Sequence, residues 1–511
     1  MLSRRALFRL GGAALVLPAG LSACSGGDGG ALIGAGGANS SEEGSGGALL
    51  TSEAPLPAPF TVALAVPPVL RPVRKDAGTD YYEITQKAAK VEILPGLRTE
   101  IWGYEGIFPG PTIVSRRGRR TVVTHRNELP VPVAVHLHGG RTAPEHDGYP
   151  TDVILPEDGG REYVYAMEQR AATLWYHDHR MDFTGPQVYR GLAGFHLIQD
   201  DAEEALGLPS GKRDIPLMIL DRSFAADGSF RYPSVDPTLM KTPGVTGPYM
   251  SGVLGDCILV NGTPWPVLDV STARYRFRLL NASNARRYRL RLDGGPGFIQ
   301  IGSDHGLLPA PIKHETLDIA QAERFDVVVD FSGHRVGDEI TLVNDHGSGG
   351  TAQVMRFRVT RQESDDSVVP DRLADVETLS DADVTVEREF TFARGGAHAH
   401  GMTLSTVNGK PFDPETIVAR PELGATERWI IRSQNVEHPI HIHLAPFQVV
   451  GKDGNDDPGP FNHGWKDTVN LDSGGRAEIL IRFDGYRGKY VFHCHNLEHE
   501  DMMMMANFEV V

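Results

Sequence analysis

Pairs of histidines separated by one residue are the feature of this sequence that most limits its fold. Five such pairs occur, although 20 histidines scattered over 511 residues would give fewer than one by chance. Residues i and i+2 point to the same face of a β-strand, so each pair can present two imidazoles together. The pairs are His136/His138, His177/His179, His398/His400, His441/His443 and His493/His495. The pattern predicts strands that carry a metal site.

Four of these pairs fall into two blocks that share one order. In the first block "VHLHGG" precedes "ATLWYHDHR", and in the third block "NVEHPIHIHLAPF" precedes "GKYVFHCHN". The middle block has a similar frame without histidines, in "NARRYRLRL" (284–292) and "GDEITLVN" (337–344). Aligned by these segments, Leu290 corresponds to His441 and Leu342 to His493. An internal repeat of this kind predicts duplicated domains, with the middle one a copy that holds no metal.

Short runs of alternating polar and apolar residues dominate the rest of the chain. Examples are "RRTVVTHRNELP", "ERFDVVVDFSG" and "RAEILIRFDG", each bounded by Gly, Pro, Asn or Asp. This pattern predicts an all-β chain of sandwiches or barrels. A short helical segment near 200–211 and a polar stretch at 361–384 indicate the boundaries. The predicted domains are 58–205, 206–370 and 371–511.

The N-terminus resembles a targeting segment. Arg4 and Arg5 precede a short apolar run, as in a twin-arginine export signal. "LSAC" resembles a lipoprotein cleavage box in which Cys24 is acylated, and ordinary cleavage nearby is the alternative. We therefore predict a signal at 1–24, a flexible Gly/Ser-rich linker at 25–57, and export to the periplasm or cell surface. Membrane contact is expected only through an N-terminal lipid anchor.

Charge and cysteine content exclude two classes. A net charge of −16 argues against nucleic acid as a partner, because phosphates would be repelled. The three cysteines, Cys24, Cys257 and Cys494, do not make a disulfide framework. Cys257 is expected to be a small buried apolar residue. The oligomeric state stays open at this point.

The segment "VFHCHNLEHEDMMMM" (491–505) indicates which metal is bound. In a strand, His493 and His495 project to one face and Cys494 to the other, so one tripeptide can reach two metal centres. Imidazoles suit zinc, copper, iron and nickel, whereas one cysteine with two histidines and a weak methionine makes a blue-copper site. A structural zinc site would normally use more than one cysteine. The mixture predicts several coppers.

With the motifs "HLHGG", "WYHDH", "HPIHIHLAPF" and "HCHNLEHEDMMMM", the chain resembles the multicopper oxidases over about 90–511. The resemblance implies three cupredoxin-like domains (Greek-key β-sandwiches or barrels) and four copper ions. It also implies the ligands: type 1 copper takes His438, Cys494, His499 and axial Met504; type 2 takes His136 and His441; the type 3 pair takes His138, His177, His179, His443, His493 and His495. Asp178 stands where the third domain has Cys494, so the first domain is expected to lack type 1 copper.

The resemblance also implies an activity. Such an enzyme couples one-electron oxidation of a small-molecule donor to four-electron reduction of O2 to water. "YEGIFPGPTI" and "HCHNLEHED" are similar to the spore-coat laccase and bilirubin oxidase branch, which implies phenols, aromatic amines or tetrapyrroles as donors. One alternative is a cuprous oxidase for copper tolerance, which would carry a methionine-rich segment. Another is a non-catalytic copper-storage protein or scaffold, which would have surplus thiols or broken ligand sets.

Two acids and several histidines lie outside the ligand motifs. Asp147 in "PEHDGYP" and Glu500 beside His499 are predicted to deliver protons to the oxygen site, and solvated surface charges are the alternative. A solvated loop is expected for His398 and His400, with an auxiliary metal role as the alternative. Ordinary roles are expected for His305, His314 and His346.

Overall fold

A computed structural model of the chain describes residues 46–399 and 402–511. The predicted export signal and the acylation site at Cys24 lie outside the described residues, as does His400. Within the described ranges, no helix is long and apolar enough to cross a bilayer.

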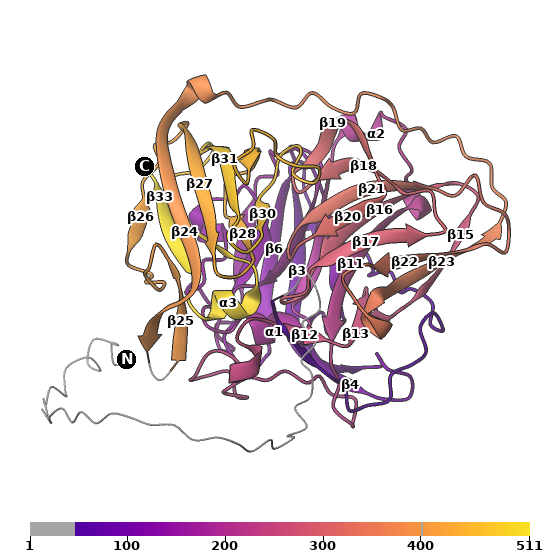
Figure 1. The fold of residues 1–511 in the computed structure, drawn as a ribbon, viewed down its shortest axis with the longest axis horizontal. Helices are drawn as coiled ribbons and strands as arrows, with labels where there is room; N and C mark the ends of the chain where they lie inside the picture. The colour runs from indigo at the N-terminus through magenta and orange to yellow at the C-terminus, as the bar shows by residue number, and fades with distance from the viewer. Residues whose placement is uncertain (1–45, 400–401) are drawn as a thin grey trace, which may run out of the picture. The chain divides into compact units, whose positions relative to one another are not determined.

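Strands dominate these residues, so the prediction of an all-β chain is confirmed. The described ranges contain three short α-helices: α1 (Thr184–Arg190), α2 (Asp201–Glu204) and α3 (Leu497–Asp501). Short 3₁₀ turns also occur: η2 (Pro144–His146), η3 (Gly211–Arg213), η4 (Gly247–Tyr249), η5 (Gly349–Ala352) and η6 (Asp381–Asp383). Helices α1 and α3 contact each other although 300 residues separate them in sequence (Figure 1).

The first domain is made of two sheets. One has the order β2-β3-β6-β8, with β4 also paired to β3, and the other has the order β5-β10-β9-β7. The strands are β2 (Arg74–Lys75), β3 (Thr79–Val91), β4 (Thr99–Tyr104), β5 (Gly110–Arg116), β6 (Arg120–Asn127), β7 (Val135–His138), β8 (Arg161–Tyr165), β9 (Ala172–Asp178) and β10 (Ala193–Gln199).

The middle domain also has two sheets, ordered β14-β13-β11-β16-β21-β18-β19 and β15-β23-β22-β17-β20. Its strands are β11 (Asp214–Arg222), β12 (Val253–Gly255), β13 (Cys257–Val260), β14 (Thr263–Pro264), β15 (Val267–Ser271), β16 (Arg274–Asn281), β17 (Tyr288–Asp293), β18 (Phe298–Ser303), β19 (Gly306–His314), β20 (Thr316–Ile319), β21 (Arg324–Asp330), β22 (Glu339–Asn344) and β23 (Gln353–Arg361).

The third domain repeats this arrangement with sheets β25-β24-β27-β31-β29 and β26-β33-β32-β28-β30. Strands β24, β27 and β31 are neighbours in the first of these (Figure 1). The strands are β24 (Val384–Ala399), β25 (Met402–Val407), β26 (Ile417–Ala419), β27 (Thr426–Gln434), β28 (His438–Ile442), β29 (Phe447–Lys452), β30 (Thr468–Leu471), β31 (Arg476–Arg482), β32 (Gly488–Cys494) and β33 (Met505–Val510).

The predicted internal repeat is visible in the strand pairing. The antiparallel pairs β7–β9, β17–β22 and β28–β32 take equivalent places in the three domains. The register of the middle pair differs by two residues from the sequence alignment, because Leu290 lies opposite Asn344 whereas His441 lies opposite His493. A two-residue offset keeps the same side chains on the same face of the sheet, so it leaves the core intact.

The N-terminal segment corrects the predicted linker. Strand β1 (Ala48–Leu50) pairs in parallel with β12, and Ala63 forms a bridge with Val267. Leu50 and Ala54 are buried, and Phe60 packs against the core of the middle domain. Residues 46–57 are therefore folded, because these apolar anchors outweigh the glycines before them. Residues 58–63, predicted to begin the first domain, contact the middle domain through Phe60 and Ala63.

The domain boundaries at 205/206 and 370/371 stay predictions. Each falls between strands, since β10 ends at Gln199 before β11 begins at Asp214, and β23 ends at Arg361 before β24 begins at Val384.

Apolar side chains between the paired histidines fill the domain cores and fix the strands. Val135 and Leu137 alternate with the histidines of β7 and are buried in the first core. Ile440, Ile442 and Phe492 do the same in the third core. Each such side chain contributes about 1.5–3 kcal/mol on burial. The alternation therefore holds the histidines on the opposite face.

Candidate metal centre

The cysteine of the third domain lies between two histidines. Cys494 ends β32, His438 begins β28 and His499 lies on α3. The Sγ atom of Cys494 is 3.5 Å from His438 Nδ1 and 3.6 Å from His499 Nδ1. All three side chains are buried, and their ligand atoms lie within 4.8 Å of one another. This is a set of one sulfur and two nitrogens suited to one metal ion.

Met504 belongs to the same buried cluster as Cys494 and is fully inaccessible to solvent. The backbone N–H of Cys494 donates to the carbonyl of Met504 at 3.1 Å, which holds the two residues together. The other methionines of the run lie elsewhere. Met505 packs with Tyr149 and Phe412, and Met502 lies against Gly244.

Burial sets the protonation of this site. It raises the pKa of the Cys494 thiol well above its usual value and lowers the pKa of His438 to about 4. A neutral imidazole keeps a lone pair for a metal, whereas the thiol must lose its proton on binding. Uptake of metal here therefore releases a proton.

Eight histidines meet at a second site, where β7 and β9 of the first domain face β28 and β32 of the third. One trio is His179, His443 and His493: the Nε2 atom of His493 is 3.2 Å from that of His179 and 3.3 Å from that of His443. A second trio is His138, His177 and His495, whose ring centroids lie 5.1–5.8 Å apart.

The remaining two histidines, His136 and His441, have ring centroids 5.7 Å apart. In each of the four His-x-His pairs of the cluster, the two histidines thus belong to different groups, which explains why the pairs are needed. His136 also stacks on His443 and His138 on His441, with centroids 3.8 and 3.6 Å apart. The twelve predicted metal-site residues are therefore brought together in two places.

The Nε2 atoms of these rings are suited to bind a metal. Backbone carbonyls occupy several Nδ1 atoms, as Asp147 does for His136 at 2.6 Å and Asp467 does for His441 at 2.8 Å. Within the cluster, buried Nε2 atoms without a hydrogen-bond partner remain on His136, His138, His177, His441 and His495. Buried unpaired nitrogens are costly unless something binds them. A bound Nδ1–H leaves the lone pair on Nε2, the usual arrangement of a metal-ligating histidine.

The predicted acids Asp147 and Glu500 are buried beside this cluster and are not surface charges. Asp147 Oδ2 accepts from His443 Nδ1 at 2.7 Å. Glu500 Oε2 lies 3.2 Å from His493 Nδ1, and Oε1 lies 3.5 Å from His179 Nδ1. Burial raises the pKa of Asp147 well above its usual value. Burial would also raise the pKa of Glu500, but His493 and His179 outweigh it and lower that pKa.

Two further acids of α3, not singled out by the sequence, join the domains. Glu498 accepts hydrogen bonds from Tyr232 Oη at 2.7 Å and from Asn284 Nδ2 at 2.9 Å, both in the middle domain. Asp501 accepts from the backbone N–H groups of Thr184 and Gly185, where α1 of the first domain begins. The helix that carries His499 is thereby fixed from both sides.

Asp467 was also missed by sequence reasoning. Its Oδ1 atom lies 3.6 Å from the Nδ1 atoms of both His138 and His441, and it accepts from Arg324 Nη1 at 2.7 Å. Burial alone would raise the pKa of Asp467, but Arg324 and His138 keep it well below its usual value. The guanidinium of Arg324 would repel a metal ion between Asp467, His138 and His441. Asp467 therefore supports the cluster and does not form a further metal site.

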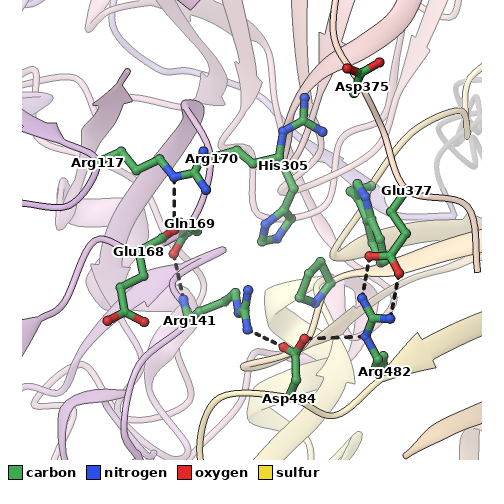
Figure 2. Close-up of a pocket in the computed structure, with 12 residues that line it drawn as sticks. Arg117, Arg141, Glu168, Gln169, Arg170, His305, Asp375, Glu377, Arg482 and Asp484 are labelled. Carbon is green, nitrogen blue, oxygen red and sulfur yellow. Dashed lines mark hydrogen bonds and ion pairs between the residues drawn. The ribbon is translucent and has the colours of Figure 1, made fainter. Parts of the chain in front are cut away.

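A surface pocket of about 230 Å³ opens where residues of all three domains meet (Figure 2). A chain of ion pairs lines it, in which Asp484 contacts both Arg141 and Arg482, and Arg482 pairs with Glu377. His305 lies in the pocket, with Nε2 3.0 Å from Asp467 Oδ2 but not aligned for a hydrogen bond. An ordinary role was predicted for His305, because its neighbour Asp467 is distant in the chain.

The other singled-out residues are placed as follows. His314 Nε2 lies 2.9 Å from Gln300 Oε1, and His346 is partly buried near Asp318. His398 is exposed on the β24–β25 hairpin. Cys257 is fully buried in β13, so the apolar role predicted for it is confirmed.

Several known proteins are similar to this chain. Two family models, each described as multicopper oxidase, match residues 85–203 and 381–511. A laccase from Bacillus subtilis (strain 168) is 37% identical over 509 residues, with 88% of this chain and 98% of that protein covered. The chain belongs to the multicopper oxidase family. A bilirubin oxidase from Albifimbria verrucaria is 37% identical, with 88% and 81% covered. The solved laccase of Pediococcus acidilactici Pa5930 aligns with a TM-score of 0.80 at 33% identity, covering 91% and 95%.

Membership agrees with the geometry of this multicopper oxidase. The two matched regions contain the strands that bring all eight cluster histidines together and the segment that carries Cys494. Most of the middle domain lies between them. The resemblance read from the sequence is thus confirmed, together with a fold of cupredoxin-like domains and laccase-like oxidase function.

Proposed function

We propose that this oxidase binds four copper ions per chain. The type 1 ion is held by His438, Cys494, His499 and Met504; the type 2 ion by His136 and His441; the type 3 pair by His138, His177, His179, His443, His493 and His495. The unpaired buried Nε2 atoms of the cluster support the type 2 and type 3 ions, because copper is a partner that imidazoles accept. The short distances from Cys494 Sγ to the Nδ1 atoms of His438 and His499 support the type 1 ion. The division of the six type 3 histidines into two trios supports one ion at each trio.

Bound copper supplies one-electron chemistry, with single electrons taken from a donor at one centre and four delivered to O2 at the other. The chain's own contribution is the link between the centres. Cys494 faces His438 and His499, and its backbone continues into His493 and His495, which turn towards the cluster. One strand end therefore touches both centres.

We propose phenols, aromatic amines or tetrapyrroles as donors. Support comes from the relatives, whose names are laccase and bilirubin oxidase. A cuprous oxidase would carry a methionine-rich segment, whereas here the 12 methionines gather only at Met502–Met505 and three of these four serve other contacts or the core. A storage protein or scaffold would not require two complete ligand sets joined through the backbone of one cysteine.

We propose that Asp147 and Glu500 deliver the protons that O2 reduction consumes. Both carboxylates contact the Nδ1 side of cluster histidines, and Oδ1 of Asp147 has no partner, which leaves it free to exchange a proton with water. Asp147→Asn and Glu500→Gln should keep copper and colour, because the amide oxygen can still face histidine Nδ1 and the amide nitrogen replaces an oxygen that has no hydrogen-bond donor. In Asp467→Asn, by contrast, the amide nitrogen would face a donor of Arg324. In stopped-flow experiments, the reduced variants should be reoxidised by O2 more slowly than wild type, most of all at higher pH. Equal reoxidation rates across the pH range would remove the proposed role.

We propose that residues 1–24 direct export and that Cys24 carries the lipid, so that the oxidase works in the periplasm or at the cell surface. The twin arginines and the "LSAC" box support this. Mass spectrometry of the mature N-terminus tests it: an acylated Cys24 supports the anchor, and a free N-terminus elsewhere supports ordinary cleavage.

Oxygen uptake by the copper-loaded protein tests the activity. A phenol, bilirubin and Cu(I) are offered in parallel at matched concentration. We expect uptake with a phenol or bilirubin to exceed that with Cu(I). Faster uptake with Cu(I) would favour the cuprous oxidase, and no uptake with any donor would favour storage or a scaffold.

A further inference from the structure

Asp147 and Asp467 occupy matched places on opposite sides of the histidine cluster. The backbone carbonyl of Asp147 accepts from His136 Nδ1, and its carboxylate accepts from His443 Nδ1. The carbonyl of Asp467 accepts from His441 Nδ1, and its carboxylate faces His138 Nδ1. His136 and His441 are equivalent in the repeat, as are His138 and His443. Each aspartate thus supports one stacked pair of rings.

The surroundings of the two carboxylates differ. Oδ1 of Asp147 has no hydrogen-bond partner. Both oxygens of Asp467 are taken by the two Nη atoms of Arg324, and Oδ1 also accepts from Thr468 Oγ1 at 2.9 Å. A two-pronged pair of this kind fixes both the direction and the charge of a carboxylate. Asp467 is therefore held at both carboxylate oxygens, whereas Asp147 is hydrogen-bonded at one.

The groups that fix Asp467 come from the middle domain. Arg324 begins β21, and its backbone N–H donates to Asp304 Oδ1 at 2.8 Å. Asp304 Oδ2 in turn accepts from the backbone N–H groups of Asp467 and Thr468, at 3.2 and 3.3 Å. Lys466, fully buried, adds an ion pair to Asp304 at 3.2 Å. The middle domain, which contributes no residue to the histidine cluster, thus binds the segment 466–468 beside the cluster.

We propose that Asp467, fixed by Arg324 and Asp304 of the middle domain, is a positioning residue that holds His138 and His441 in place for copper. The proposal rests on the copper assignment above, in which His441 serves the type 2 ion and His138 the type 3 pair. The Oδ1 atom of Asp467 lies 3.6 Å from the Nδ1 atoms of both rings, and Arg324 Nη1 lies 3.3 Å from His138 Nδ1. The Asp467–Arg324 pair thus orients ligands of two neighbouring centres. The middle domain thereby acts as a support for the oxygen site.

The variant Asp467→Asn tests this role, with copper content and electron paramagnetic resonance as the readouts. Loss of an outer partner of a metal-ligating histidine typically weakens binding about 10–100-fold. We expect the type 2 signal to be altered or lost and the bound copper to fall towards three per chain, while the blue band stays. The kcat should fall about 10–100-fold with the KM for the donor unchanged. Arg324→Lys keeps the charge without the fork and should show a smaller change of the same kind.

Asp326→Asn is the matched control. Asp326 lies on β21, the strand that Arg324 begins, and is likewise buried and hydrogen-bonded to an arginine, Arg276. Its hydrogen bonds go to that arginine and not to a cluster histidine. The control should keep the wild-type copper content and type 2 signal. The proposal is overturned if Asp467→Asn also keeps both, or if Asp326→Asn loses them equally. Should Asp467→Asn not fold, Arg324→Lys with a wild-type spectrum would overturn it as well.

These readouts separate this proposal from the proposed function. A wild-type protein that shows blue and type 2 copper but oxidises no donor would contradict the function, while the spectra of Asp467→Asn would still decide the positioning role. A wild-type protein without type 2 copper would overturn both.

Discussion

Strands β9 and β32 end in the same three-residue pattern and differ in its middle residue. In β9 the sequence is His177-Asp178-His179, and in β32 it is His493-Cys494-His495. All four histidines turn to the shared cluster, and each middle residue turns back into its own domain. The two strand ends thus carry the same residues on the face that meets the cluster, and different residues with different roles on the opposite face.

Those purposes are a metal site and a structural anchor. Cys494 faces two imidazoles, whereas Asp178 accepts hydrogen bonds from the backbone N–H groups of Ala134 and Arg180, at 3.0 and 3.1 Å. The amide of Gln187, on α1, donates to Asp178 as well. Three residues before the first cluster histidine of each domain, Val133 stands where the third domain has His438. The first domain therefore lacks more than one ligand.

Removing the thiolate should have the largest effect. We expect Cys494→Ser to abolish the blue absorption and donor oxidation, because serine is a poor ligand for the type 1 ion, while the eight-histidine cluster keeps its copper. Absorption spectra and copper analysis check this. The control is Cys257→Ser, which changes the other buried free cysteine of the described residues, on β13 of the middle domain, and should stay blue. A blue Cys494→Ser protein would refute the site.

The reverse change should not create a second blue centre. Asp178→Cys places a thiol at the matched position of β9, but Val133 supplies no imidazole, so no new blue band is expected. The thiol also cannot satisfy the three donors around Asp178, so the free energy of unfolding should fall by about 2–4 kcal/mol. Denaturant titration measures this fall. A blue band in the double variant Asp178→Cys/Cys494→Ser would show that the first domain has ligands of its own.

The comparison also shows what the sequence could predict. Strand alternation was enough to predict the all-β fold, and the repeated His-x-His pairs were enough to predict strands that carry a metal site, since both follow from local spacing. The division of the ligands among the centres came from the resemblance to the multicopper oxidases. The position of Cys494 opposite its flanking histidines needed no more than the period of a strand.

Contacts made over long distances in the chain could not be predicted. Arg324 and Asp467 are 143 residues apart, and nothing local marks either as a partner of a cluster histidine. The same holds for Glu498, whose partners Tyr232 and Asn284 lie in another domain. The folded segment 46–57 was missed because it directly follows a glycine-rich stretch and has only a few apolar anchors that bind it to the middle domain.

Met504 should tune the third-domain centre without building it. An axial methionine binds weakly, so Met504→Leu should keep the blue band and raise the reduction potential. The rate of donor oxidation should change less than in Cys494→Ser. Redox titration of the blue band measures the shift. Met505→Leu is the control, because Met505 packs with Tyr149 and Phe412 and should leave the potential unchanged. Loss of copper from Met504→Leu, or a shift caused by Met505→Leu, would contradict the assignment.

A buried histidine that binds no metal offers the smallest test. His125 on β6 is as buried as the cluster histidines, its Nδ1 lies 2.9 Å from Gln86 Nε2, and burial lowers its pKa to about 3. In the unfolded chain its pKa returns to about 6.5. The unfolded state therefore binds the extra proton between these values, so stability is full above pH 6.5 and is lost as the pH falls towards 3. In His125→Gln, the free energy of unfolding should fall less steeply in this window, by about 1.4 kcal/mol per pH unit, and should follow the wild-type slope above it. Denaturant titrations of the metal-free proteins across the window measure both slopes, and equal slopes would show that His125 is protonated in the folded chain.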